Sequence, residues 1–200
     1  MKVGMIFECG PDGADKKVCE NLARRLQPDI EISSVTLDNK PNLLLECGQV
    51  AALLLNEGCN RIIIVWDLYP PWREKKQRPC RKEDSDAIME SLVQAGVTSL
   101  DVHLVCIEEE LEAWLLADGR AISAVLSRPT HQVKVKDKKN PEGVQNPKKQ
   151  LNKIFQEHAG YPYIDRQHAQ IIVEKLEDLN KIKRSTTFVR FAVKVTGRKP

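Results

Sequence analysis

The residues of this chain best suited to chemistry are acids that directly follow three short runs of apolar, strand-forming residues. The runs are Lys2–Phe7, Arg61–Trp66 and Val102–Ile107. Glu8 follows the first run and Asp67 the second, and a group of glutamates that includes Glu112 follows the third. Parallel strands end at one edge of a sheet, about 5 Å apart, and ligands bind outside those ends. We therefore expect these acids to lie close together.

Carboxylates held at this spacing predict a metal site. Like charges so close raise one another's pKa unless a positive charge compensates them. A hard divalent cation, bound through one or two carboxylates with retained waters, provides that compensation. The leading interpretation is a site for Mg²⁺ (or Mn²⁺) formed by Glu8, Asp67 and Glu112, which would also be the catalytic residues.

Each acid also has a plainer structural explanation. Glu8 lies in a turn beside glycines, where a solvated glutamate is common. Asp67 fits a helix cap or an anchor for the loop that follows it. Glu112 stands among apolar residues of a predicted helix, and a buried charge there needs a partner or a metal. The glutamates at 108–110 fall at the start of that helix, where the macrodipole favours negative charge.

Strands that alternate with helices must position these acids. Besides the three runs above, Ile30–Leu37 alternates as a strand, and apolar residues at helical spacing follow each strand. The last of these helices is predicted to span Glu109–Leu126. This order predicts an α/β fold with a mainly parallel four-stranded sheet flanked by helices. We expect residues 1–126 to form this α/β core, residues 127–147 a lysine- and proline-rich loop or lid, and residues 148–200 a helical C-terminal extension that packs on the core.

Basic residues cluster near the predicted acidic edge. One cluster follows Asp67 and comprises Arg73, Lys75, Lys76, Arg78 and Arg81, with Lys82 beside it. Tyr69 and Trp72 interleave with this cluster, and aromatic stacking combined with attraction to phosphates is how proteins grip single-stranded nucleic acid. We therefore expect the cluster to bind nucleic acid, with an ordinary solvated surface as the alternative.

Composition bounds the remaining interpretations. The chain has 200 residues, 42% of them apolar, and a formal net charge of +3, which fits a globular domain and argues against a disordered protein. Its six cysteines are spread singly, so we expect reduced thiols. The first apolar run is too short for a signal peptide, and no run approaches the ~20 residues of a membrane span. We expect a cytoplasmic protein with no membrane partner. The Phe- and Val-rich last helix is a candidate interface for a homo-oligomer.

Motifs spread over most of the chain carry a family resemblance. They are Glu8-Cys9-Gly10-Pro11 after the first strand, Asp67 after the third, ELEAWLLAD at Glu110–Asp118, Pro147-Lys148-Lys149 before a helix, and Arg184-Ser185-Thr186-Thr187-Phe188 at the start of the last helix. With these motifs the chain resembles the DUF4276 family of Toprim-like bacterial proteins. More broadly it resembles the Toprim fold of topoisomerases, primases and OLD-type nucleases. ELEAWLLAD is the most specific of the motifs.

The resemblance implies a Toprim-like Rossmannoid core and Mg²⁺-dependent cleavage of nucleic-acid phosphodiesters, with Glu8 as general acid/base or ligand and Asp67 as ligand. It also implies a role in bacterial anti-phage defence, often beside an ATPase partner. The chain departs from the Toprim pattern in one respect, because Asp67-Leu68-Tyr69 stands where an Asp-x-Asp pair is expected. Glu112, Asp84 or Asp86 would have to replace the missing acid. A catalytically inactive Toprim-like module that binds nucleic acid or senses a partner is the alternative.

Overall fold

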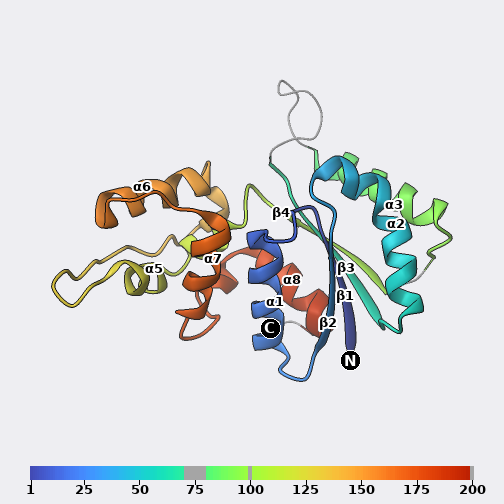
Figure 1. Ribbon diagram of the computed structural model, residues 1–200, viewed down its shortest axis with the longest axis horizontal. Helices are drawn as coiled ribbons and strands as arrows, with labels where there is room; N and C mark the ends of the chain where they lie inside the picture. The colour runs from blue at the N-terminus through green and yellow to red at the C-terminus, as the bar shows by residue number, and fades with distance from the viewer. Residues whose placement is uncertain (70–79, 99–100, 199–200) are drawn as a thin grey trace.

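Four parallel strands form a single sheet in the computed structural model, which describes residues 1–69, 80–98 and 101–198 (Figure 1). The strands are β1 (Lys2–Phe7), β2 (Glu31–Thr36), β3 (Arg61–Asp67) and β4 (Val102–Ile107). Their order across the sheet is β2-β1-β3-β4, and each neighbouring pair is parallel. The predicted α/β fold with a parallel four-stranded sheet is confirmed, and the arrangement is Rossmann-like.

The strand order reverses between β1 and β3. From β1 the chain crosses to β2 on one side, and it then returns to β3 and β4 on the other side. Ligands of open α/β sheets bind at such a reversal, in the crevice outside the carboxyl ends of the strands. Phe7, the last residue of β1, pairs with Val65 of β3. Glu8 and Asp67 therefore both stand at the reversal.

Helices cover both faces of the sheet (Figure 1). They are α1 (Ala14–Leu26), α2 (Lys40–Asn56), α3 (Arg81–Gln94), α4 (Glu112–Leu116), α5 (Gly119–Leu126), α6 (Pro147–Ala159), α7 (Asp165–Glu174) and α8 (Thr186–Thr196), with the 3-10 turns η1 (Pro141–Gly143) and η2 (Ile182–Arg184). Helices α2 and α3 lie on one face, and α1 and α8 lie on the other. Helix α7 packs against α1 and extends this second layer.

The central strand β3 shows why two layers form. Its side chains alternate between the faces, as strand geometry requires. Ile62, Ile64 and Trp66 join the core beneath α2 and α3, whereas Ile63 and Val65 join the core beneath α1 and α8. All five are buried. A strand that is apolar on both faces is typical of the middle of a parallel sheet.

The prediction of one continuous helix over residues 109–126 is wrong, because the segment divides into α4 and α5. Glu109 has a φ of 63°, which is incompatible with a right-handed helix. Helix α4 ends at Leu116, and Asp118 caps α5 by accepting a hydrogen bond from the backbone N–H of Arg120. The following Gly119 lies against the carbonyl of Val135, where an added Cβ would approach the oxygen to 2.4 Å. The break therefore lets the 127–147 segment pass close to the helix.

Residues 127–147 run over the surface in a largely extended conformation and are hydrogen-bonded to the helices they cross. The backbone N–H of Lys138 donates to the carbonyl of Leu116, and that of Val135 donates to the hydroxyl of Ser123. Asp137 pairs with Lys181 near the C-terminal helices. The segment therefore connects α4 and α5 to the C-terminal third. Its role as a lid stays a prediction.

The structure bears on the state of the cysteines and on the presence of helices that could span a membrane. The six cysteines all fall in the described ranges and are free thiols, four of them buried. This agrees with the expected reduced state. No helix in residues 1–69, 80–98 or 101–198 combines the length and apolar character needed to cross a bilayer.

We predict that Gly48→Ala destabilises the fold by separating α2 from α3. A Cβ at Gly48 would lie 2.0 Å from the backbone carbonyl oxygen of Ser91, so one helix must move. Such overpacking costs about 1–3 kcal/mol, measurable as a lower free energy of unfolding in urea. Gly10→Ala is the matched control, since its Cβ would meet only the Asp38 carboxylate at 3.4 Å. Equal stability of the two variants would contradict the prediction.

Candidate active site

A tight turn after β1 brings the start of α1 to the sheet edge. The backbone N–H of Gly13 donates to the carbonyl of Gly10 at 2.8 Å. A Cβ at Gly13 would lie only 2.3 Å from the Cys9 Sγ, so this close packing requires glycine. The turn places Asp15, in the first turn of α1, near Glu8. The Asp15 charge accordingly raises the pKa of Glu8.

Asp67, the last residue of β3, lies within a cluster of carboxylates that are far apart in the sequence. Its pKa is raised well above the ordinary value, first by burial and then by the charges of Asp15, Glu8 and Glu112. The three predicted site residues, Glu8, Asp67 and Glu112, are therefore electrostatically coupled at one end of the sheet. Asp15 joins them as a fourth member.

Burial raises the pKa of the other members as well. Burial raises the pKa of Glu8 to about 8; Lys40 opposes the shift and Asp15 adds to it. Glu112 is only 4% exposed, and burial raises its pKa to about 8, with Lys148 opposing. For Asp15, burial raises the pKa to about 6. The protein thus holds acids in a place where their charge is unfavourable, which is a recurring property of functional sites.

Two of these acids bury an oxygen without a hydrogen bond. Among the described residues, neither Glu8 Oε2 nor Asp67 Oδ1 has a partner. An unsatisfied buried acceptor costs about 1–3 kcal/mol, and more when it is charged. Carboxylate oxygens are the ligands that a hard divalent cation takes, so Glu8 and Asp67 fit such an ion.

The cluster does not form a cage around a cation. Within the part of the chain that the structure describes, no three His, Cys, Asp or Glu side chains are spaced as in a formed metal site. Mg²⁺ is usually held by one or two carboxylates and keeps several waters. The arrangement is therefore suited to an ion that is shared with waters or with a substrate oxygen.

The start of α6 supplies a positive charge beside Glu112 and Asp15. Lys148 opposes the pKa shifts of both acids. Its backbone N–H donates to Glu110 Oε2 at 3.0 Å, and its ammonium group pairs with Asp165 at the start of α7. These contacts hold the C-terminal third of the chain against the sheet edge.

Tyr163 closes the same side of the cluster. It is only 6% exposed, and its hydroxyl has no geometrically satisfactory hydrogen bond within the described residues. Burial and the nearby charges of Glu112 and Asp165 raise its pKa, so the phenol stays protonated. The neutral phenol and the Glu112 carboxyl are thus buried together.

A second lysine holds the end of β3 from the other face of the sheet. Lys40, at the start of α2, is 5% exposed, and its Nζ donates to the carbonyls of Asp67 at 2.5 Å and Leu68 at 3.1 Å. It also pairs with Asp84 at 3.6 Å, and Asp84 accepts a hydrogen bond from Trp66 Nε1 at 3.2 Å. This buried network fixes the backbone from which the Asp67 side chain projects.

Other predicted residues lie elsewhere or are already paired. Glu108 binds Arg81 at 3.5 Å and Arg190 at 3.1 Å, which supports its structural explanation. Arg81 is thus engaged by an acid, although its side chain is half exposed. The remaining members of the proposed nucleic-acid cluster lie outside the described residues; they are Arg73, Lys75, Lys76 and Arg78.

The sequence analysis missed Asp15, Lys40 and Lys148 as site residues. Asp15 had an ordinary explanation as an acid at a helix start, although its place at the end of the turn that follows β1 was a usable signal. Lys148 belongs to the quoted motif Pro147-Lys148-Lys149, whose position beside the acids depends on the packing of α6. Nothing in the local sequence around Lys40 indicates that its side chain crosses to the end of β3.

Comparison with known families supports the broad assignment. The family model for a domain of unknown function, DUF4276, matches residues 14–195. The chain belongs to the DUF4276 family. The matched range includes Asp15, Asp67 and Glu112, and it begins after Glu8. Neither the curated proteins nor the solved structures contain a match to this chain.

For this DUF4276 protein we predict that stability falls with pH when divalent cations are removed. Glu112 has a pKa of about 8 in the folded chain and an ordinary value of 4.5. Below pH 4.5 this carboxyl is protonated in both states. As the pH rises from 4.5 to about 8 it ionises first in the unfolded chain, so the free energy of unfolding falls over this window and the loss is complete above about 8. Glu112→Gln is neutral at every pH and should flatten this part of the profile, measured by urea unfolding in EDTA. The exposed Asp86→Asn is the control. If the Glu112→Gln and wild-type profiles were parallel, Glu112 would not be the titrating group.

We further predict that Lys40→Met strongly destabilises this protein. The substitution keeps the length of the side chain but leaves Asp84 buried without its cation and removes the hydrogen bonds to the Asp67 and Leu68 carbonyls. Breaking a buried pair from one side costs about 3–5 kcal/mol, measurable as the free energy of unfolding. Lys82→Met is the control, because Lys82 is exposed and pairs with Asp86 on the surface of α3. A loss no larger than that of the control would show that the network is dispensable.

Proposed function

We propose that the protein is a metal-dependent nuclease of the Toprim type that cleaves nucleic-acid phosphodiesters. One observation carries the proposal: Glu8 and Asp67 each bury an unsatisfied carboxylate oxygen at the point where the strand order reverses. Open α/β sheets bind their ligands at this point. The resemblance of the Glu8 turn, Asp67 and ELEAWLLAD to Toprim-like proteins supplies the reaction class.

Glu8 and Asp67 are the residues that would hold Mg²⁺ or Mn²⁺, with Glu112 beside them. The ion would supply a Lewis acid for the phosphoryl oxygens and charge stabilisation for the attacking and leaving oxygens. Lys40 keeps the Asp67 backbone in place, and Lys148 limits the repulsion around Glu112. The chain itself thus positions the carboxylates and excludes water from one side of the cluster.

Glu112 is the acid best placed to replace the one missing from the Asp-x-Asp pattern. Asp84 is engaged with Lys40 and Trp66, and Asp86 forms an exposed pair with Lys82. Glu112, by contrast, contributes directly to the raised pKa of Asp67. We therefore assign the catalytic and metal-binding role to Glu8, Asp67 and Glu112, and we leave Asp84 and Asp86 as structural residues.

The biological setting is proposed from the family resemblance. We propose that the nuclease acts in bacterial anti-phage defence, in the cytoplasm and beside an ATPase partner. The basic cluster that follows Asp67 would hold the nucleic-acid backbone. Within it Arg81 is half exposed and adjoins the sheet edge through Glu108.

A second candidate function is a catalytically inactive module that binds nucleic acid or senses a partner. The observation that favours it is Tyr69, which replaces the second acid of the Toprim pair. Tyr69 lines a small cavity of about 180 Å³ with Glu109, Glu110, Gln145 and Asn146. A phenol in that place offers stacking or a hydrogen bond instead of a metal ligand. Such a module would show salt-dependent binding without turnover.

We predict that Glu8→Gln and Asp67→Asn each abolish Mg²⁺- or Mn²⁺-dependent cleavage of nucleic acid while the fold persists. Each change removes one carboxylate charge but keeps the size of the side chain. Cleavage of labelled single- and double-stranded DNA and RNA measures activity, and circular dichroism measures folding. Asp86→Asn is the control, since its carboxylate lies on the exposed face of α3. Wild-type protein that binds but never cleaves, with either metal and with its ATPase partner, would favour the inactive module.

A further inference from the structure

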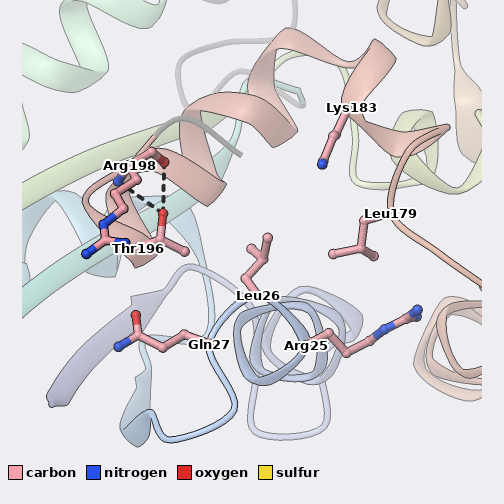
Figure 2. A pocket seen from close by; sticks show the side chains of 7 residues that line it. All are labelled: Arg25, Leu26, Gln27, Leu179, Lys183, Thr196 and Arg198. Carbon is pink, nitrogen blue, oxygen red and sulfur yellow. Dashed lines mark hydrogen bonds between the residues drawn. The ribbon is translucent and has the colours of Figure 1, made fainter.

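A pocket of about 580 Å³ opens at the carboxyl end of α1 (Figure 2), which is the end of this helix away from the carboxylate cluster. Helix α1 begins beside the cluster, and its other end forms one wall of this pocket, next to the C-terminal end of α8. Arg25, Lys183 and Arg198 line the pocket together with Leu26 and Leu179. No acidic side chain is among its described lining residues.

Part of this positive charge has a structural explanation. The C-terminal ends of helices carry unsatisfied carbonyls and a partial negative charge, which attract basic side chains. Arg25 donates to the carbonyl of Val173 at 3.1 Å, in the last turn of α7, and to that of Leu176 at 2.8 Å, just beyond the helix. Arg61 similarly donates to the Lys194 carbonyl near the end of α8. Arg25 is therefore already compensated.

Lys183 and Arg198 are not compensated in this way. Among the described residues, neither side chain has a hydrogen bond or an ion pair, although the backbone of Arg198 is tied to the hydroxyl of Thr196. Figure 2 shows the Lys183 amino group pointing toward Leu26 and Leu179. Lys183 thus points into the cavity and Arg198 lies at its far side, and the described lining residues offer neither of them a counter-charge.

The pocket also has an apolar floor with polar groups on both sides. Leu26 and Leu179 form the floor, and Lys183 lies above them on one side. The Gln27 amide and the Arg198 guanidinium lie together on the other side (Figure 2). A ligand would therefore meet positive charge at its ends and hydrocarbon beneath its middle.

We propose that this pocket binds a small molecule that carries phosphate on a planar or apolar body, which is the chemistry of a nucleotide. Phosphate oxygens accept charge-assisted hydrogen bonds from Lys183 and Arg198. The body of the ligand covers Leu26 and Leu179, and the Gln27 amide offers both a donor and an acceptor to its edge. The volume lies within the range of about 300–1,000 Å³ found for small-molecule sites. The inference does not depend on the nuclease proposal, because the pocket and the carboxylates lie at opposite ends of the sheet.

The test is isothermal titration calorimetry of the full chain with ADP in EDTA, compared with inorganic phosphate and a short single-stranded oligonucleotide. We expect saturable binding of ADP that is tighter than that of phosphate. Lys183→Gln should weaken ADP binding about tenfold, the loss expected for one charged hydrogen bond. Lys183→Arg should retain most of the affinity. Lys153→Gln, on the exposed side of α6, is the matched control and should have no effect.

Several results would overturn the proposal. One is the absence of saturable ADP binding to wild-type protein, and another is ADP binding that Lys183→Gln leaves unchanged. Phosphate binding as tightly as ADP would exclude a role for the apolar floor. Tighter binding of the oligonucleotide, lost in Lys183→Gln, would assign the pocket to a nucleic-acid backbone instead. Equal thermal melting of all variants controls for folding, and Glu8→Gln should bind ADP normally, which separates this site from the nuclease site.

Discussion

The candidate site at the carboxyl ends of the strands has more buried negative charge than positive charge, and its other properties follow from this imbalance. Four carboxylates gather where β1 and β3 end, and within the described residues Lys40 and Lys148 oppose them. Both lysines are shared, Lys40 with Asp84 and Lys148 with Asp165. The remaining negative charge must be balanced by protons or by a cation. The raised pKa values of these acids correspond to a balance by protons. The unsatisfied oxygens of Glu8 and Asp67 are available to bind a cation instead.

The topology explains why this imbalance arises at that place. In a sheet of order β2-β1-β3-β4, the connections that leave the ends of β1 and β3 run to opposite sides of the sheet. They therefore leave a crevice between them at those strand ends. Helices α6 and α7 and the loop between them then close one side of the crevice. Lys148 comes from α6, Tyr163 from the loop and Asp165 from α7. The C-terminal third is therefore structurally part of the candidate site.

The site residues that could be predicted were those whose burial follows from their neighbours in the sequence. Glu8 and Asp67 directly follow apolar runs, and Glu112 is an acid among apolar helical positions, so their burial was readable from the sequence. Lys40 and Lys148 were not, because a lysine side chain reaches far and its partner is decided by packing between distant helices. The break between α4 and α5 was missed for the same reason. It depends on the close passage of the chain near Gly119, which is a tertiary contact.

Helix α1 runs from the carboxylate cluster at one end of the sheet to the basic pocket at the other end. Asp15 lies at the amino end of this helix and Arg25 at its carboxyl end, so the helix dipole stabilises acids at one end and bases at the other. The side chains themselves then favour a cation at the carboxyl ends of the strands and an anion at the opposite edge, in each case against the sign of the α1 dipole. The formal net charge of only +3 does not reveal this arrangement, because acidic and basic residues offset one another in the total whatever their positions. For this fold, the placement of charge rather than its total indicates which ligands each end of the sheet can bind.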